Sequence, residues 1–328
     1  MSVMRGRILR AACLWVACAA LAGCKAKGDD AKAAAGSPPF MSKVASATPA
    51  TDDAPPPDST GGFDGKRAFD HVAKQVGFGP HPSGSPAIAQ VQEYLLSELK
   101  SYGCAVETDA FTSDTPIGRL PMKNFLVKIP GEKPGVILLA THYDTKILDN
   151  FVGADDGGSS TAVMLELARL LCSQHGRYAV WIAFFDGEEA VKQWSDTDGR
   201  YGSRQMAARL AASGDVKKIK AFLLADIVGG RKASFPRESS STPALVDLVW
   251  NTADKLGYGA IFLNSESAAQ DDHDSFMKRG VPAVDVIGDF VNNGYWHTPQ
   301  DSLDKISAKT LAIVGHVFLE SVKELQMK

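Results

Sequence analysis

Short, continuous apolar runs alternate with longer helical patterns along the chain. Runs of this kind are typical of strands that are buried on both faces of a sheet. Helical spacing of Val163, Leu167 and Leu170 predicts a helix over 159–171, and an amphipathic pattern predicts another over 309–325. Strands that alternate with helices predict an α/β domain, a three-layer αβα sandwich around a central mixed, mostly parallel sheet. The predicted strands are 136–140, 179–185, 221–225 and 282–287.

Polar residues that can bind metals follow directly on three of these apolar runs. His142 follows the first run, Glu188 and Glu189 follow the second, and Asp226 follows the third. In open parallel sheets, ligands bind beyond the carboxyl ends of the strands. The sequence therefore predicts a functional site at that edge of the sheet. Other residues of the domain with metal-binding side chains are Asp144, Asp155, Asp156, Asp271, Asp272, His273 and His297.

The first residues of the chain have the pattern of an export signal. Arginines at 5, 7 and 10 precede an apolar run over 11–22, and Leu-Ala-Gly-Cys follows at 21–24. This motif is similar to a bacterial lipobox, which predicts a signal peptide over 1–24 and a lipid on Cys24; a plain secretory signal is the alternative. Residues 25–62 are rich in Ala, Ser, Thr and Pro and predict a disordered tether before a catalytic domain over 63–328. We therefore expect the protein in the bacterial cell envelope, with the lipid as its only membrane attachment.

Composition and charge argue against a nucleic-acid ligand and leave the other classes of function open. The 328 residues are 45% hydrophobic and 22% charged, as in ordinary globular proteins. A net charge of −3 and the lack of a basic stripe give no electrostatic footprint for nucleic acid, which favours a small or peptide substrate. Cys104 and Cys172 are the cysteines that remain in the predicted domain, and their spacing leaves their redox state open.

The acidic residues and histidines fit a catalytic zinc site. A catalytic zinc takes three ligands from His, Asp, Glu or Cys and keeps one position open. If Glu189 binds the metal, the adjacent Glu188 lies within reach of a group held there and can move protons. Taken singly, each residue has another explanation: a Glu-Glu pair is usually solvated, and 155–158 could form a turn before a helix.

The order of these residues resembles that of the di-zinc aminopeptidases, and the longer motifs are more similar to animal-type glutaminyl-peptide cyclotransferases. The resemblance extends from about residue 69 to the C-terminus. Asp271 before the Asp-His pair, and tryptophans at 194 and 296, favour the cyclotransferases. The matching stretches are His-Tyr-Asp at 142–144, Gly-Ala-Asp-Asp at 153–156, Phe-Phe-Asp-Gly-Glu-Glu-Ala at 184–190, Trp-Ser at 194–195, Tyr-Gly-Ser-Arg at 201–204, Gln-Asp-Asp-His at 270–273 and Trp-His-Thr at 296–298.

The resemblance implies a role for each matching residue. One Zn²⁺ per chain would be held by Asp156, Glu189 and His297, and Glu188 would be the acid/base. Asp226 and Asp271 would form a carboxylate pair that shares a proton, because two close carboxylates resist double ionisation. Trp194, Trp296 and Gln270 would line the substrate pocket, and His142 would be a second-metal ligand or would support the first. The implied reaction converts an N-terminal glutaminyl residue of a peptide to pyroglutamyl and releases ammonia.

Two other functions remain open from the sequence. A metallo-aminopeptidase would bind two zinc ions and use Glu188 to activate water, whereas a non-catalytic binding protein of this fold would lack some of the ligands. The chain departs from the cyclotransferase pattern in two places, a short basic loop at 231–232 and the stretch 237–264. We expect the protein to be a monomer.

Overall fold

The computed structural model describes residues 53–328. Six of its strands form the main sheet, in the order β1-β2-β4-β3-β5-β8. The strands β4, β3, β5 and β8 are parallel, and β1 and β2 form an antiparallel hairpin that pairs with β4 at one edge. The predicted mixed, mostly parallel sheet is confirmed. The bounds are β1 Val106–Thr115, β2 Gly118–Ile129, β3 Gly131–His142, β4 Gly176–Phe185, β5 Ile219–Asp226 and β8 Ala283–Ile287.

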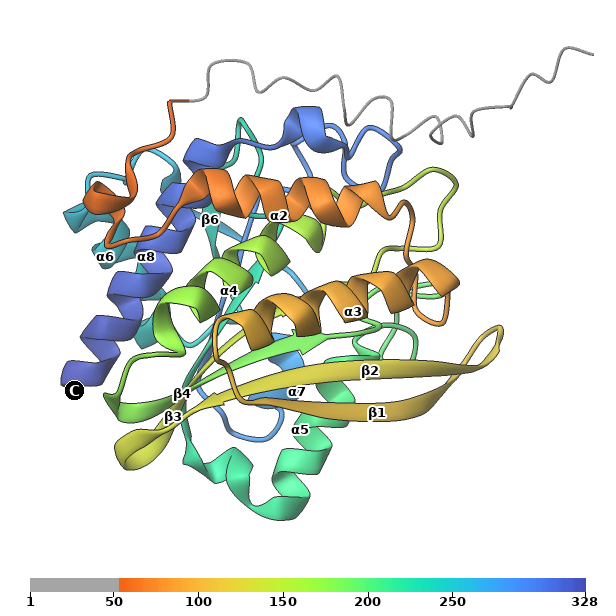
Figure 1. Ribbon diagram of the computed structural model, residues 1–328, viewed down its shortest axis with the longest axis horizontal. Helices are drawn as coiled ribbons and strands as arrows, with labels where there is room; N and C mark the ends of the chain where they lie inside the picture. Colours follow the sequence, from red (N-terminus) through yellow and green to blue (C-terminus); the bar gives the residue numbers. More distant parts are fainter. Residues whose placement is uncertain (1–52) are drawn as a thin grey trace, which may run out of the picture. The chain divides into compact units, whose positions relative to one another are not determined.

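Helices cover both faces of the sheet and make three layers (Figure 1). The helices α2, α3, α4, α6 and α8 belong to the larger apolar core, and α5 and α7 contribute to a smaller one on the opposite face. A short parallel pair, β6 and β7, lies outside the main sheet. The bounds are α2 Gly65–Gly77, α3 Pro86–Ser101, α4 Gly158–Leu171, α5 Tyr201–Ser213, β6 Phe235–Glu238, α6 Pro243–Lys255, β7 Phe262–Ser267, α7 His273–Met277 and α8 Ala308–Met327; the 3₁₀ turns are η1 Pro57–Thr60, η2 Asp215–Lys218 and η3 Leu303–Lys305.

The strand side chains alternate between the two cores, as the period of two in a β-strand requires. Along β3, Ile137 and Leu139 enter the larger core, whereas Leu138 and Ala140 enter the smaller one. Because both faces are covered, the strand reads as a continuous apolar run in the sequence. The strands and helices predicted from those runs all appear in the structure, within a few residues of their expected bounds.

The folded part begins earlier than the tether boundary at residue 62 predicted. Residues 57–60 form η1, and Thr60 is buried and donates its hydroxyl to the carbonyl of Phe63 at 2.6 Å. Phe63 is fully buried against Gly315 of α8, where an added Cβ would lie 2.2 Å from the Phe63 ring. This contact holds the preceding residues against the helix, so part of the predicted tether is ordered. The predicted signal peptide and lipid site at Cys24 lie outside the described residues.

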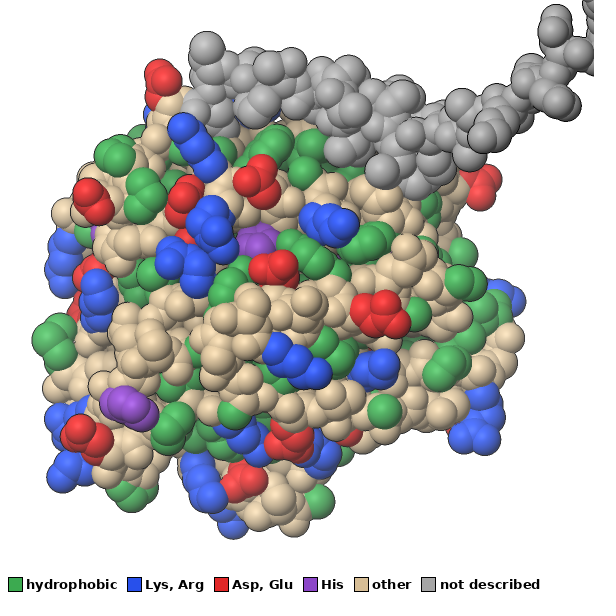
Figure 2. Space-filling view, viewed as in Figure 1, with side chains coloured by type: hydrophobic (Ala, Val, Ile, Leu, Met, Phe, Trp, Pro, Cys, Tyr) green, Lys and Arg blue, Asp and Glu red, His purple; other side chains and the backbone are tan. Residues whose placement is uncertain are grey.

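A disulfide joins Cys104, which follows α3, to Cys172 at the end of α4. It settles the question that the spacing of the two cysteines left open. The face that carries α2, α3 and α4 mixes cationic and anionic side chains without a patch of one sign (Figure 2). Within residues 53–328 we find no helix of the length and apolarity that crossing a membrane requires.

Candidate active site

The carboxyl ends of the parallel strands bring the predicted site residues together. The strand β3 ends at His142 and β5 ends at Asp226, while Glu188 and Glu189 lie just beyond the end of β4. Asp156 comes from the turn before α4, and His297 from the loop that follows β8. Five segments far apart in sequence thus meet at one edge of the sheet, as the polar residues after each apolar run predicted.

Asp156, Glu189 and His297 form a cluster of the kind that can hold a metal ion, with ligand atoms within 4.8 Å of one another. His297 Nε2 lies 3.3 Å from Asp156 Oδ2 and 3.2 Å from Glu189 Oε1. Asp156 Oδ2 is buried and accepts no hydrogen bond within the described residues, and its contact with His297 is an ion pair. A buried carboxylate oxygen without a donor is costly unless a cation compensates it. The donor set of one imidazole and two carboxylates fits zinc.

A second cluster shares Asp156 with His142 and Asp226. His142 Nε2 lies 3.1 Å from Asp226 Oδ1 and 3.3 Å from Asp156 Oδ1. The other ring nitrogen of His142 is 3.6 Å from Asp144. His142 therefore lies between three carboxylates, beside the first cluster, where it can serve as a ligand or as a partner that orients Asp156.

Buried carboxylates hold the backbone of the candidate metal ligands in place. Asp144 accepts hydrogen bonds from the amides of Glu188 at 3.0 Å and Glu189 at 3.3 Å. Asp301, which is fully buried, accepts from the amides of Asp155 and of Asp156 at 2.8 and 3.1 Å. Anchors of this kind fix the direction of the ligands before a metal arrives. The glycine that follows Asp156 is required because Gly157 has a φ of +81°, and a Cβ there would lie 2.8 Å from His142.

A pocket of about 560 Å³ opens beside this cluster and contains all the predicted substrate-binding residues. Trp194 Nε1 donates to Gln270 Oε1 at 3.0 Å, which joins two pocket walls from distant segments. Trp296 stacks on His297 with ring centres 4.0 Å apart and packs on Phe290 at 4.7 Å. Glu188, Asp226 and Asp271 also line the pocket. Each sequence-predicted site residue within the described part therefore faces this pocket or adjoins it.

The electrostatics of the pocket favour protonated carboxyl groups. Burial raises the pKa of Glu188 well above its usual range, and the nearby carboxylates of Asp271 and Glu189 raise it further. Burial also raises the pKa of Asp226 to about 7, against the opposing effect of His142. Carboxyl groups with raised pKa values in a cleft can exchange protons near neutral pH, as general acid/base catalysis requires.

Strained backbone is concentrated around the site. Arg200, Ile227 and His297 are residues other than glycine with φ values of +53°, +52° and +52°. His297 belongs to the metal cluster, Ile227 directly follows Asp226, and the amide of Arg200 donates to the carbonyl of Glu188 at 2.6 Å. Such conformations cost on the order of 1–3 kcal/mol each and persist where the surrounding structure imposes them.

Sequence reasoning missed several residues that the structure brings to the site. Lys146 Nζ lies 3.1 Å from Glu189 Oε2 and lines the pocket, as does Phe290. Glu238 is buried and accepts from the amide of Ala269 at 3.3 Å, which anchors the segment before Gln270. A single lysine, phenylalanine or glutamate has no spacing that would mark it in a sequence.

Among the metal-capable residues from the sequence that lie outside the metal clusters are Asp155, Asp272 and His273. Asp155 accepts from Tyr295 Oη at 2.6 Å and from the amide of Gly229 at 2.7 Å. His273 lies 3.4 Å from Glu238 Oε2, and Asp272 is fully buried beside it. These side chains support the walls of the site from behind.

The fold and the site together define a zinc-exopeptidase-like enzyme, and known proteins of this class resemble the chain. The profile of peptidase family M28 matches residues 124–322, more than half of the chain. A glutaminyl-peptide cyclotransferase-like protein of Bos taurus is 30% identical over 67% of this chain, which spans 65% of the bovine protein. A glutaminyl-peptide cyclotransferase of Gloydius blomhoffii is 31% identical over 73% of this chain and 76% of its own length.

Solved structures agree with the sequence relatives. The glutaminyl cyclase of an Acidobacteriales bacterium matches with a TM-score of 0.76 and 40% identity, over 85% of this chain and 98% of that chain. A Zn-dependent exopeptidase from Parabacteroides distasonis matches with a TM-score of 0.72 and 30% identity, over 79% and 97% of the two chains. The chain therefore belongs to peptidase family M28, in which many of its relatives are glutaminyl-peptide cyclotransferases.

Proposed function

We propose that this enzyme converts N-terminal glutaminyl residues of peptides and proteins to pyroglutamyl and releases ammonia. The observation that carries this proposal is a pocket with two tryptophans, Trp194 and Trp296, beside the buried acid Glu188 and the metal cluster. The named relatives and solved glutaminyl cyclases support the same reaction. The activity of this chain follows from its membership of the family together with this pocket.

We infer that Asp156, Glu189 and His297 hold one zinc ion. The ligand atoms of these three residues lie within 4.8 Å of one another, and the buried Asp156 Oδ2 accepts no hydrogen bond within the described residues, which supports this assignment. A bound zinc ion supplies positive charge to the side-chain carbonyl of the glutaminyl residue and stabilises the negative charge that develops there. Lys146 and His297 lie against the carboxylate of Glu189, so a zinc ion and the protons of these groups compete for the same oxygens.

Glu188 moves the proton in the proposed reaction. Its buried carboxyl group has a raised pKa, which suits a group that takes a proton from the α-amine and returns it to the leaving nitrogen. Amine and amide belong to the same residue, so the attack is intramolecular and the pocket has only to hold them in position. A bond forms between the α-nitrogen and the side-chain carbonyl carbon, which closes the lactam. The bond between that carbon and the side-chain nitrogen breaks, and the nitrogen leaves as ammonia with the transferred proton.

Asp226 and Asp271 are the groups that orient the substrate amine and amide. Both are buried and line the pocket, and the carboxylate of Asp271 contributes to the raised pKa of Asp226. Asp271 Oδ2 has no hydrogen-bond partner within residues 53–328. A buried carboxylate oxygen that lacks a partner is available to accept from a substrate N–H group.

The walls of the pocket suit a short, uncharged side chain. The rings of Trp194, Trp296 and Phe290 supply flat apolar surfaces, and Gln270 is fixed by its hydrogen bond to Trp194. Excluding water from this space strengthens the interactions of Glu188 with the reacting nitrogens.

A metal-dependent aminopeptidase is the second candidate function. The cluster of His142, Asp156 and Asp226 supports it, because these residues could hold a second metal ion next to the first. In that enzyme Glu188 would activate water for cleavage of the first peptide bond. The Zn-dependent exopeptidase of Parabacteroides distasonis has the same fold.

We also propose that the enzyme is a monomer in the bacterial cell envelope, anchored by a lipid on Cys24. The signal-like pattern over 1–24 supports the anchor. The metal cluster and the pocket walls are formed by residues of one chain, so the proposed activity does not require a partner subunit.

The direct test supplies the purified protein with a short peptide that begins with glutamine, resolves the products by mass spectrometry and counts bound zinc. Loss of ammonia with the peptide bonds intact, at about one zinc per chain, is the expected result. Release of free glutamine with two metals per chain would replace the cyclotransferase with the aminopeptidase. A matched peptide that begins with asparagine is the control for the length of the side chain.

A further inference from the structure

A second pocket, of about 510 Å³, lies beside the candidate active site and shares a wall with it. The shared wall is the loop that follows β8. Ile287 at the end of β8, and Phe290 and Trp296 of the loop, line the active-site pocket, whereas other positions of the loop line the second one. Those positions are Gly288, Asp289, Asn292, Asn293, Gly294 and Tyr295.

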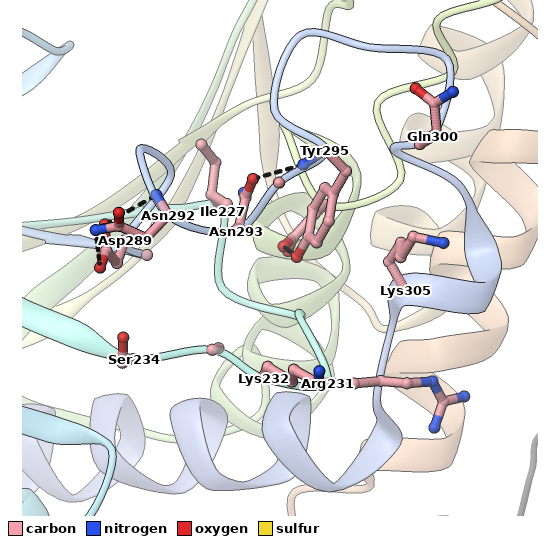
Figure 3. Close-up of a pocket in the computed structure, with 14 residues that line it drawn as sticks. Ile227, Arg231, Lys232, Ser234, Asp289, Asn292, Asn293, Tyr295, Gln300 and Lys305 are labelled. Carbon is pink, nitrogen blue, oxygen red and sulfur yellow. Dashed lines mark hydrogen bonds between the residues drawn. The ribbon is translucent and has the colours of Figure 1, made fainter.

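The opposite wall of the second pocket is basic. Arg231 and Lys232 come from the segment after β5, which lies across the cavity from the segment of Asn293 and Tyr295, and the side chain of Arg231 extends toward the side of Lys305 (Figure 3). Lys305 adds a third cation at one side. Arg231 and Lys232 form the short basic loop by which the sequence departs from the cyclotransferase pattern.

The acidic groups of this pocket already have partners. Asp155 accepts from Tyr295 and Gly229, at 2.6 and 2.7 Å. Asp289 accepts from the side-chain amide of Asn292 at 3.0 and 2.8 Å. Both carboxylates accept these hydrogen bonds from neutral donors, and within the described residues neither forms an ion pair with a cation across the cavity.

The cations differ in how they are held. Arg231 is fixed from the protein side, because its Nε donates to the carbonyl of Asp304 at 2.8 Å and its amide donates to Lys305. Lys305 pairs with the carboxylate of Asp304. Lys232 is exposed and has no ion-pair partner in the part of the chain that the structure describes.

We propose that this second pocket binds a small hydrophilic anion through a carboxylate or phosphate group. Arg231 and Lys232 line the same cavity, and such residues suit an oxyanion, since hydrogen bonds from charged donors are about twice as strong as neutral ones. The amides of Asn292 and Gln300 and the hydroxyl of Ser234 line the same cavity and can bond to further polar groups of the ligand.

The second pocket is linked to the active site through residues that are neighbours in the sequence. Tyr295 and Asp155, which bond to each other across the wall, directly precede Trp296 and Asp156 in the sequence. The binding test must therefore separate this pocket from the active site, where a metal ion or Lys146 could also attract an anion.

The test is isothermal titration calorimetry of the full-length protein with inorganic phosphate and with citrate, at about 0.15 M salt to screen loose surface attraction. A chelator removes bound metal, so that an anion cannot bind there. We expect saturable binding of one anion per chain. Lys232→Gln should weaken it about tenfold or more, as loss of a charged hydrogen bond does.

Two matched variants complete the design. Lys217→Gln removes the same charge from the opposite end of β5, and Lys146→Gln removes a cation that lines the active-site pocket next to Glu189. Both should bind the anion as the unaltered protein does. The proposal is overturned if neither anion binds saturably, if Lys232→Gln binds as before, or if Lys146→Gln loses the binding.

Discussion

The guanidinium of Arg200 lies 5.1 Å from the centre of the Trp194 ring, and Arg200 itself is almost completely buried. Its Nη1 pairs with Asp274 of α7 at 2.6 Å, and its amide donates to the carbonyl of Glu188. One buried cation thus joins a wall of the pocket, a helix and the backbone of the proposed acid/base. Arg200 positions Trp194 without lining the substrate pocket.

Replacing Arg200 should weaken substrate binding more than it slows the chemical step. A cation–π contact contributes about 0.5–2 kcal/mol, so Arg200→Met should raise KM roughly 3- to 30-fold with a smaller change in kcat. Arg200→Lys should restore part of the loss. Steady-state kinetics with a glutaminyl peptide measures both constants. Arg237→Met is the matched control, because Arg237 lies over Trp250 at 5.8 Å, outside the pocket. A fall in kcat at unchanged KM would contradict the positioning role.

Glu188 and Glu189 should separate into a proton-transfer group and a metal ligand. Glu188→Gln removes the proton carrier and should lower kcat by about 10²- to 10⁴-fold while zinc stays bound. Glu189→Gln removes a ligand and should lower zinc content, with activity lost in proportion. Metal analysis and kinetics on the same preparation distinguish the two. Equal zinc content in both variants at equal activity would refute the assignment.

Metal removal should be more complete at low pH. Burial lowers the pKa of His297, but the carboxylates of Asp156 and Glu189 against its ring raise the pKa to about 9. Zinc must displace that proton, so zinc affinity should fall as pH drops below about 9. Zinc titrations at several pH values measure the slope. An affinity that does not change with pH would exclude His297 as a ligand.

The Cys104–Cys172 disulfide should stabilise the α3–α4 side of the sheet. It closes a loop with a sequence separation of 68 residues, and the chain-entropy model assigns about 4 kcal/mol to a loop of that size. Replacing both cysteines by alanine should lower the free energy of unfolding by a similar amount. Denaturant unfolding measures this difference. The unaltered protein under reducing conditions provides the control, since it should lose the same stability.

Glu238 should contribute stability at neutral pH that disappears in acid. Burial alone would raise its pKa, but hydrogen bonds from His273, Ser240 and Ser241 lower it to about 2. The folded pKa lies below the unfolded value near 4.5, so the contribution is complete above pH ~4.5 and is lost as pH falls toward 2.

Glu238→Gln should therefore cost about 3 kcal/mol at pH 7, and the difference from the unaltered protein should narrow below pH ~4.5. Unfolding by denaturant across pH 2–7 checks both parts. Glu266→Gln on the exposed side of β7 is the control and should change stability by less than about 0.5 kcal/mol. A constant difference at all pH values would mean that Glu238 acts by packing and not by its charge.

Local patterns in the sequence determined where the strands lie and which polar residues follow their carboxyl ends. Apolar runs such as 136–140 specify buried strands, because a strand that is buried on both faces has apolar side chains at every position and does not alternate between apolar and polar residues. His142 and Asp226 follow from those runs directly, because a residue at the end of a parallel strand faces the ligand edge. The family resemblance added Asp156, Glu189 and His297, which the structure gathers within 4.8 Å.

Tertiary structure alone decided which distant side chains meet. The contacts of Lys146 with Glu189 and of Arg200 with Trp194 follow from the packing of loops, which has no periodicity along the chain. The disulfide, the ordered residues before Phe63 and the second pocket likewise depend on distances between segments far apart in sequence. Hydrophobic periodicity is a local property that the chain carries in its order of residues, whereas these contacts exist only after the sheet and its helices have packed.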